Sequence, residues 1–109
     1  MQTPSIQLLF DTLLVSWNIK NNELAELEEG RNAKYRARYR VLQHNETVNT
    51  FMEYKEKIRK EKNAVEYARL REKMTQIIGE LTLWEFEMKL EIEEIETCKM
   101  VKSAARFTE

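Results

Sequence analysis

The sequence predicts an all-α protein, and three observations lead to that prediction. Only two Gly and one Pro occur among 109 residues, and neither type occurs between Gly30 and Gly79. β-Sheets need frequent chain reversals, which Gly and Pro commonly make, so a long stretch without them favours helices. The chain is also rich in residues that favour helices, and its apolar residues recur every three or four positions. The length predicts one helical domain over residues 1–109.

The first helix is expected near residues 4–29. Thr3 and Pro4 form a start signal, because a capping hydroxyl precedes a proline whose fixed φ suits the first helical position. An apolar seam follows at spacings of three and four, with one polar interruption: Phe10, Leu13, Trp17, Leu24 and Leu27. Three further apolar residues widen the seam: Leu8, Val15 and Ile19. This width predicts contacts with more than one neighbour, and Gly30 is expected to end the helix.

The second helix is expected near residues 31–62. Its apolar stripe is looser than that of the first helix: Ala33, Ala37, Val41, His44, Val48, Phe51 and Ile58. Lys55 and Lys62 interrupt the same face, which predicts a partly exposed helix. The segment 45–50 (NETVNT) is rich in cap-forming residues, and Thr50 with Glu53 fits a capping box, so a break in the helix is one interpretation of this segment.

The third helix is expected near residues 64–107 and has the most regular periodicity. Ten of its residues alternate at spacings of three and four: Tyr67, Leu70, Met74, Ile77, Leu81, Trp84, Met88, Glu91, Ile95 and Cys98. The pattern keeps its phase through Gly79, which places the preceding turn near residues 60–64, with Asn63 as the cap. In the rival interpretation the chain turns at Gly79, and the acidic segment 80–96 folds back onto the basic segment that precedes it.

Charge segregation supports antiparallel packing of these helices. Residues 1–30 carry one cation and five anions, residues 31–73 carry thirteen and six, and residues 74–109 carry four and eight. A basic middle helix between two acidic ones favours one register over others. The expected architecture is therefore an elongated antiparallel three-helix bundle or coiled coil.

The length of the third helix predicts a surface for association. At 1.5 Å per residue it would span about 65 Å, more than the first helix, at about 40 Å, can cover. Exposed apolar surface marks interaction sites, so five residues form the predicted stripe for self-association or for a partner helix: Leu81, Trp84, Met88, Ile92 and Ile95. The predicted function is that of a non-enzymatic protein–protein interaction or assembly module, with a homodimer favoured.

The basic stretch 31–40 supports an alternative function. Its five cations alternate with Tyr35 and Tyr39, and they are Arg31, Lys34, Arg36, Arg38 and Arg40. Cations bind phosphates and aromatic rings stack on bases, so a small nucleic-acid-binding or regulatory factor is the second hypothesis. The overall net charge of −1 argues against it, because nucleic-acid-binding domains are usually basic.

Catalysis and cofactor binding are not expected. One His and one Cys cannot supply the four ligands of a usual zinc site or the two Glu-x-x-His motifs of a di-iron bundle. The segment 23–29 (ELAELEE) is similar to the Glu-x-x-Glu motif with which all-α nucleotide pyrophosphatases hold Mg²⁺. That family adds Glu-x-x-Asp on a second helix, whereas this chain has no Asp after Asp11 and offers only Glu53 and Glu56. Such an enzyme is a remote alternative.

Two further expectations concern location and resemblance. The apolar N-terminal segment contains Asp11 and lacks a preceding cation, and Cys98 is the one cysteine, so a cytoplasmic protein without a membrane span is expected. The chain length, Trp17, and Leu42-Gln43-His44 resemble spectrin-type three-helix repeats. Trp84 lies at a different heptad phase, and the polar loop before the last helix is missing. The resemblance implies a fold and no function.

Overall fold

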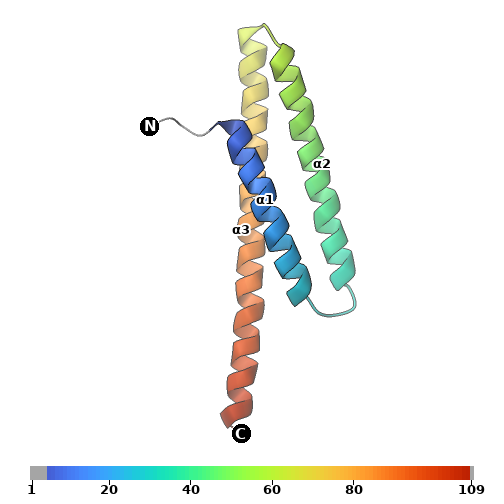
Figure 1. Cartoon of the computed structure of the whole chain (residues 1–109), viewed down its shortest axis with the longest axis vertical. Coiled ribbons are helices and arrows are strands. Elements are labelled where there is room, and N and C mark those ends of the chain that lie inside the picture. Colours follow the sequence, from blue (N-terminus) through green and yellow to red (C-terminus); the bar gives the residue numbers. More distant parts are fainter. Residues whose placement is uncertain (1–4, 109) are drawn as a thin grey trace.

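The computed structural model describes residues 5–108, with side chains as far as residue 102. It contains three helices: α1 (Ile6–Leu27), α2 (Ala33–Lys60) and α3 (Ala64–Thr108). They form an elongated helical bundle in which each helix runs antiparallel to the one before it (Figure 1). The bundle measures 70 × 36 × 17 Å. The all-α prediction and the three-helix order are confirmed.

Each helix end has a local cause. Ser5 caps α1, because its Oγ accepts a hydrogen bond from the backbone N–H of Leu8 at 3.1 Å. The predicted cap, Thr3 with Pro4, lies outside the described residues. After α1, Gly30 takes a φ of 103°, which side-chain-bearing residues rarely adopt. At the second turn, Asn63 Oδ1 accepts from the N–H of Val65 at 2.9 Å, so the predicted cap of α3 is confirmed.

Two interpretations of the sequence are corrected by the structure. The chain does not turn at Gly79, because α3 continues through this residue without a positive φ. The segment 45–50 does not break α2 either. The hydroxyl of Thr50 donates to the carbonyl of Glu46 at 3.0 Å, and that of Thr47 donates to Gln43 at 3.1 Å. Both hydroxyls are therefore satisfied within the helix, and neither is left to cap a new one.

The core consists of two clusters along α3. The upper cluster is formed by Phe10, Phe51, Met74, Ile77 and Leu81, with the rings of Phe10 and Phe51 stacked at 3.8 Å. The lower cluster is formed by Trp17, Leu24, Met88 and Ile92. α3 supplies residues to both clusters, and its contacts with α1 are more extensive than those between α1 and α2. α3 is thus the element that organises the bundle.

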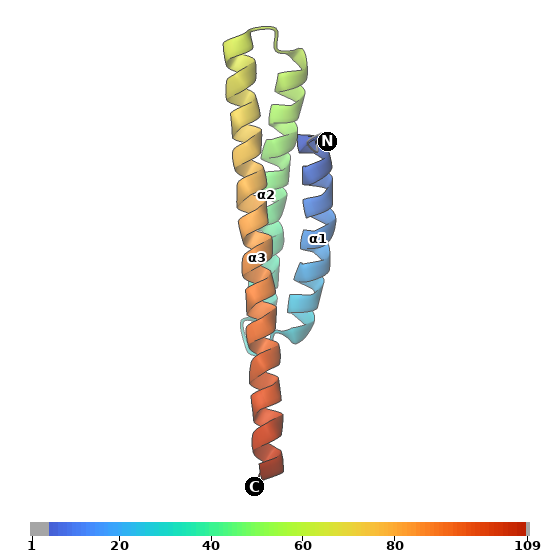
Figure 2. The same ribbon diagram turned by 90° about the vertical axis from the view of Figure 1, so that its left-hand side faces the viewer.

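α1 is the shortest helix and lies beside the middle of α3 (Figure 2). Beyond the start of α1, the upper ends of α2 and α3 form a two-helix hairpin. At the opposite end, α3 projects past the α1–α2 loop without a neighbouring helix (Figure 1). The predicted mismatch in helix lengths is therefore present at both ends of α1.

Candidate interaction surfaces

The predicted association stripe on α3 lies mainly inside the bundle. Leu81, Met88 and Ile92 are buried at 1%, 4% and 4% exposure, whereas Trp84 and Ile95 are half-buried. α1 covers this part of α3, because Phe10, Trp17 and Leu24 pack on it. The fully buried members of the stripe therefore serve the chain's own core. The uncovered length of α3 begins after Ile95 and includes exposed Met100 and Val101.

Each helix also carries apolar side chains on the face opposite the core. Nine residues make two and a half helical turns, so residues nine apart point in opposite directions. The exposed residues pair in this way with buried ones: Leu8 with Trp17, Val15 with Leu24, Tyr35 with His44, Leu42 with Phe51, Leu83 with Ile92, and Leu90 with Leu81. We call these the outer stripes: Leu8, Val15 and Ile19 on α1; Tyr35, Tyr39 and Leu42 on α2; Leu83, Phe86 and Leu90 on α3.

The outer stripes distinguish these helices from those at the surface of a self-sufficient domain. A helix at such a surface usually presents polar residues on its solvent face. The middle of α1, residues 12–19 (TLLVSWNI), contains no charged residue at all. Leu8, Val15 and Ile19 were expected to widen the first apolar seam, whereas they lie on the face opposite the core.

The basic stretch is divided by the structure into two groups. Arg36 and Arg40 form ion pairs with Glu28, whose side chain is only 2% exposed. The Arg36 Nε–Glu28 Oε2 distance is 2.8 Å, and Arg40 Nε also donates to Asn21 Oδ1 at 2.8 Å. These two arginines therefore fasten the α1–α2 connection. A second group, Arg31, Lys34 and Arg38, is exposed and has no ion-pair partner among the described side chains.

The carboxylate of Glu28 is held in its ionised form. Burial opposes its ionisation, but the hydrogen bonds from Arg40 and Arg36 and the charges of both outweigh this effect, so the pKa of Glu28 is lowered. Neither the buried acid nor its role as the centre of this network was indicated by the sequence. Glu28 is one of several acids in the segment 23–29, and its choice as the partner of Arg36 and Arg40 depends on the geometry of the loop.

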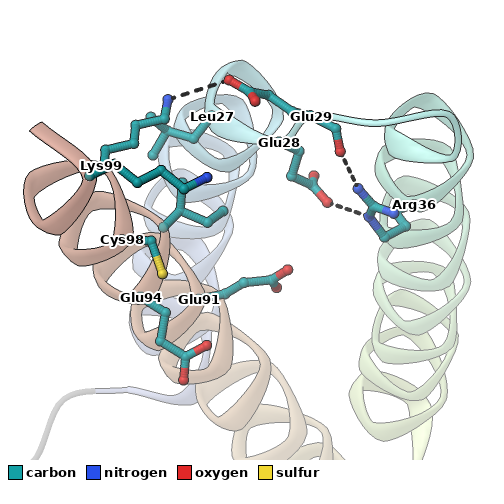
Figure 3. A pocket seen from close by; sticks show the side chains of 10 residues that line it. Leu27, Glu28, Glu29, Arg36, Glu91, Glu94, Cys98 and Lys99 are labelled. Atoms are coloured by element: carbon teal, nitrogen blue, oxygen red, sulfur yellow. Dashed lines mark hydrogen bonds and ion pairs between the residues drawn. The ribbon is translucent and has the colours of Figure 1, made fainter. Parts of the chain in front are cut away.

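A groove opens between α2 and α3 at the end of the bundle where the α1–α2 loop lies (Figure 3). Its wide part encloses about 730 Å³ and its narrow continuation about 280 Å³, and both parts are lined by Glu91. We call the two parts together the base groove. Five apolar residues on its walls are Trp17, Leu27, Trp84, Met88 and Ile95. Three exposed acids on the α3 wall are Glu87, Glu91 and Glu94.

The composition of α2 explains why the groove stays open. The first turns of α2 present Ala33 and Ala37 as the only apolar residues of its predicted stripe before Val41. Arg36 and Arg40, which also face this end, direct their guanidinium groups to Glu28. No large apolar side chain of α2 is therefore available to fill the space against α3. The buried residues of α2 are His44 and Phe51, both farther along the helix.

His44 is a packed residue in the core. Its ring stacks on Trp17 with the ring centroids 3.7 Å apart, and its exposure is 5%. The Nε2 atom is buried and has no hydrogen-bond partner among the described residues. Burial lowers the pKa of His44, although a hydrogen bond with Asn45 partly opposes the shift. The ring is therefore held neutral.

The carboxylates singled out by the pyrophosphatase-like motif are not brought together. Glu23 pairs with Lys20 at 3.8 Å, while Glu56, on the distant part of α2, pairs with Arg59 at 2.9 Å. The described part of the chain contains no group of three or more His, Cys, Asp or Glu residues that could hold a metal ion. Cys98 is an exposed free thiol at the edge of the base groove. Among residues 5–108, no helix is long and apolar enough to cross a membrane.

Comparison of the chain with protein-family models, with characterised proteins and with solved structures gives no match.

Proposed function

We propose that this chain is a non-enzymatic protein–protein interaction or assembly module. The observation that carries the proposal is the presence of outer stripes on all three helices, opposite the core. Apolar side chains such as Val15, at 62% exposure, and Leu83, at 53%, gain about 25 cal/mol for each Å² removed from water. A partner that covers an outer stripe would provide that burial.

The partner class that fits best is another helix. Each outer stripe has the spacing of three, four or seven residues by which an amphipathic helix contacts a neighbour. A homo-oligomer, with a dimer favoured, and capture of a different helical protein both use this chemistry. We further propose a cytoplasmic location, since the lone cysteine is a free thiol.

The test is affinity capture from a native lysate, with tagged protein as bait and an untagged copy added to reveal self-association. Three variants each replace one outer stripe by Gln: L8Q/V15Q/I19Q, Y35Q/Y39Q/L42Q and L83Q/F86Q/L90Q. A control replaces exposed charged residues of α3 instead: K73Q/E80Q/E96Q. We expect stoichiometric recovery of one protein, its loss in at least one stripe variant, and no change in the control. Recovery of nothing, or of the same protein by all variants, would overturn the proposal.

Nucleic-acid binding is the second candidate function. One observation favours it: Arg31, Lys34 and Arg38 are exposed beside Tyr35, which is 72% exposed. Against it, Arg36 and Arg40 are occupied by Glu28, which leaves three of the five predicted cations. The discriminating variant is therefore K34A/R38A. Tight binding to RNA or DNA that falls steeply with salt and disappears in K34A/R38A would reverse our ranking of the two functions.

A further inference from the structure

We infer that the base groove of one chain receives the outer face of α2 from a second copy of the same chain, so that the protein forms a side-by-side dimer. This inference rests on the proposed function and specifies the partner and the contact. The face in question, here called the basic–aromatic face, consists of Tyr35, Tyr39 and Leu42 with Arg31, Lys34 and Arg38. Within the described part of the chain, these side chains are exposed and the three cations form no ion pair.

Part of the base groove has a charge opposite to that of the basic–aromatic face. The α3 wall carries Glu87, Glu91 and Glu94, which have no ion-pair partner among the described side chains, and at its far end Lys102 and Lys99, the latter paired with Glu29. Figure 3 shows Glu91 directed into the space between α3 and α2. The basic–aromatic face carries three cations that are also unpaired within the described part of the chain. Complementary charge of this kind selects a partner and a register.

The two surfaces also match in chemistry and in extent. Tyr35, Tyr39 and Leu42 project at spacings of four and three, and they are 72%, 66% and 64% exposed. The groove offers half-buried Trp84, Leu27 and Ile95 for apolar contact. It also offers carboxylates that can accept hydrogen bonds from the tyrosine hydroxyls. Tyr35 to Leu42 and Glu87 to Glu94 each span seven residues, or about 10 Å of helix.

A second copy satisfies the two surfaces at once. Tyr39 of the basic–aromatic face lies about 40° around α2 from Gln43, which lines the groove, whereas Lys34 and Arg38 lie on the far side of the face, so it is the tyrosine side that a two-fold axis can place in the partner's groove. Each exposed tyrosine has about 100–150 Å² left to bury. Doubled by symmetry, and with the groove surface that they cover, these side chains bring the interface to about 1,200 Å² or more, the size of a stable specific interface.

Charge exchange tests the inference directly. K34E/R38E makes the face acidic, E91K/E94K makes the groove basic, and the quadruple variant exchanges both. All four positions are exposed, so the substitutions should leave the helices intact. Circular dichroism of each variant checks that its helix content is unchanged. A matched control, K55E/R71E, reverses two exposed cations on the hairpin end of α2 and α3, away from the groove. Oligomeric state is measured by light scattering and sedimentation over a range of protein and salt concentrations.

We expect the unmodified chain and K55E/R71E to dimerise, with affinity that falls as salt rises. Each double variant should weaken dimerisation by at least about 100-fold. A mixture of the two double variants, and the quadruple variant alone, should dimerise again because both pairings are restored.

Two results would overturn the inference. If the unmodified chain stays monomeric at the highest concentration, no second copy is bound, whereas the proposed function still stands or falls by lysate capture. If dimerisation survives K34E/R38E and E91K/E94K, or is not restored in the mixture, the dimer uses another surface and the proposed function is unaffected.

Discussion

Gly79 lies in the middle of α3, where glycine weakens a helix by its conformational freedom. A Cβ atom built on it meets no atom of another helix within 4 Å, and its φ is not positive. We therefore expect Gly79→Ala to stabilise the fold by about 0.5–1 kcal/mol. Gly30 is the matched opposite, because its φ is 103°, and Gly30→Ala should destabilise by about 1 kcal/mol. Urea denaturation of both variants measures the change in the free energy of unfolding. A destabilising Gly79→Ala would contradict a continuous α3.

His44 gives the fold a pH dependence whose sign follows from its environment. Burial lowers its pKa in the folded chain below the ordinary value of 6.5. The unfolded chain therefore binds the proton more readily, so stability is complete above about pH 6.5 and falls as the pH drops towards the folded-state pKa. The free energy of unfolding should fall by at most about 1.4 kcal/mol for each pH unit.

The measurement is the free energy of unfolding at about pH 7.5 and about pH 5.5, a window above the titration of ordinary carboxylates. His44→Phe keeps an aromatic ring against Trp17 and removes the titrating group. In this window His44→Phe should therefore lose most of the pH dependence. An equal slope in both proteins would assign the effect to another group.

At the scale of elements, the ends of the helices were readable from single residues. Gly30 predicted the first turn and Asn63 the second, because each supplies a backbone conformation or a cap that depends on few neighbours. The regular phase through Gly79 correctly favoured one long helix over a turn. The second helix was predicted as continuous and is so, and the alternative of a break at Thr50 is excluded, since a hydroxyl inside a helix can also bond to the preceding turn.

The base groove could not be predicted in the same way. It depends on three elements together: the end of α1 at Leu27, the small residues at the start of α2, and the projection of α3. The predicted seam of α3 contains most of the residues that α3 buries, although its members Tyr67, Glu91 and Cys98 are exposed. Which helix covers Leu81, Met88 and Ile92 depends on where α1 lies along α3. Position along the bundle is a long-range property that residue spacing does not contain.

The α1–α2 connection offers a test at this scale. Glu28→Gln keeps the size of the side chain but removes the charge that Arg36 and Arg40 share. We expect a loss of about 1–3 kcal/mol, because a buried charge-assisted network is left incomplete. Glu29→Gln is the control, as that side chain is 83% exposed and, among the described side chains, pairs with Lys99 alone at 3.9 Å, and it should cost less than about 0.5 kcal/mol.

The same network has a defined acid sensitivity. The pKa of Glu28 is lowered in the folded chain, so its contribution is present above the ordinary carboxylate pKa of 4.5 and is lost as the pH falls through the folded-state value. The difference in stability between the unmodified chain and Glu28→Gln should therefore shrink in acid. A difference that persists well below this range would mean that the charge of Glu28 is not what stabilises the loop.

At the scale of the whole molecule, the elongated shape explains why the chain exposes so much apolar surface. Its radius of gyration is 18.7 Å, whereas a compact domain of this length has about 13 Å. A long bundle of three helices has a thin core, and each helix has one face towards it. The opposite faces can be buried only by something outside the bundle. The outer stripes, the base groove and the projecting end of α3 are all consequences of this one property.

Shape in solution distinguishes the ways in which two copies could meet. The side-by-side dimer doubles the mass and overlaps the two bundles over their base grooves. Its largest dimension should therefore remain below about 90 Å, only modestly longer than the 70 Å of one chain. End-to-end contact through the projecting α3 would instead approach about twice the length of one chain. Small-angle X-ray scattering at the concentration where light scattering reports a dimer measures this length. A doubled length would place the contact at the ends of the bundle, and K34E/R38E should then leave it unchanged.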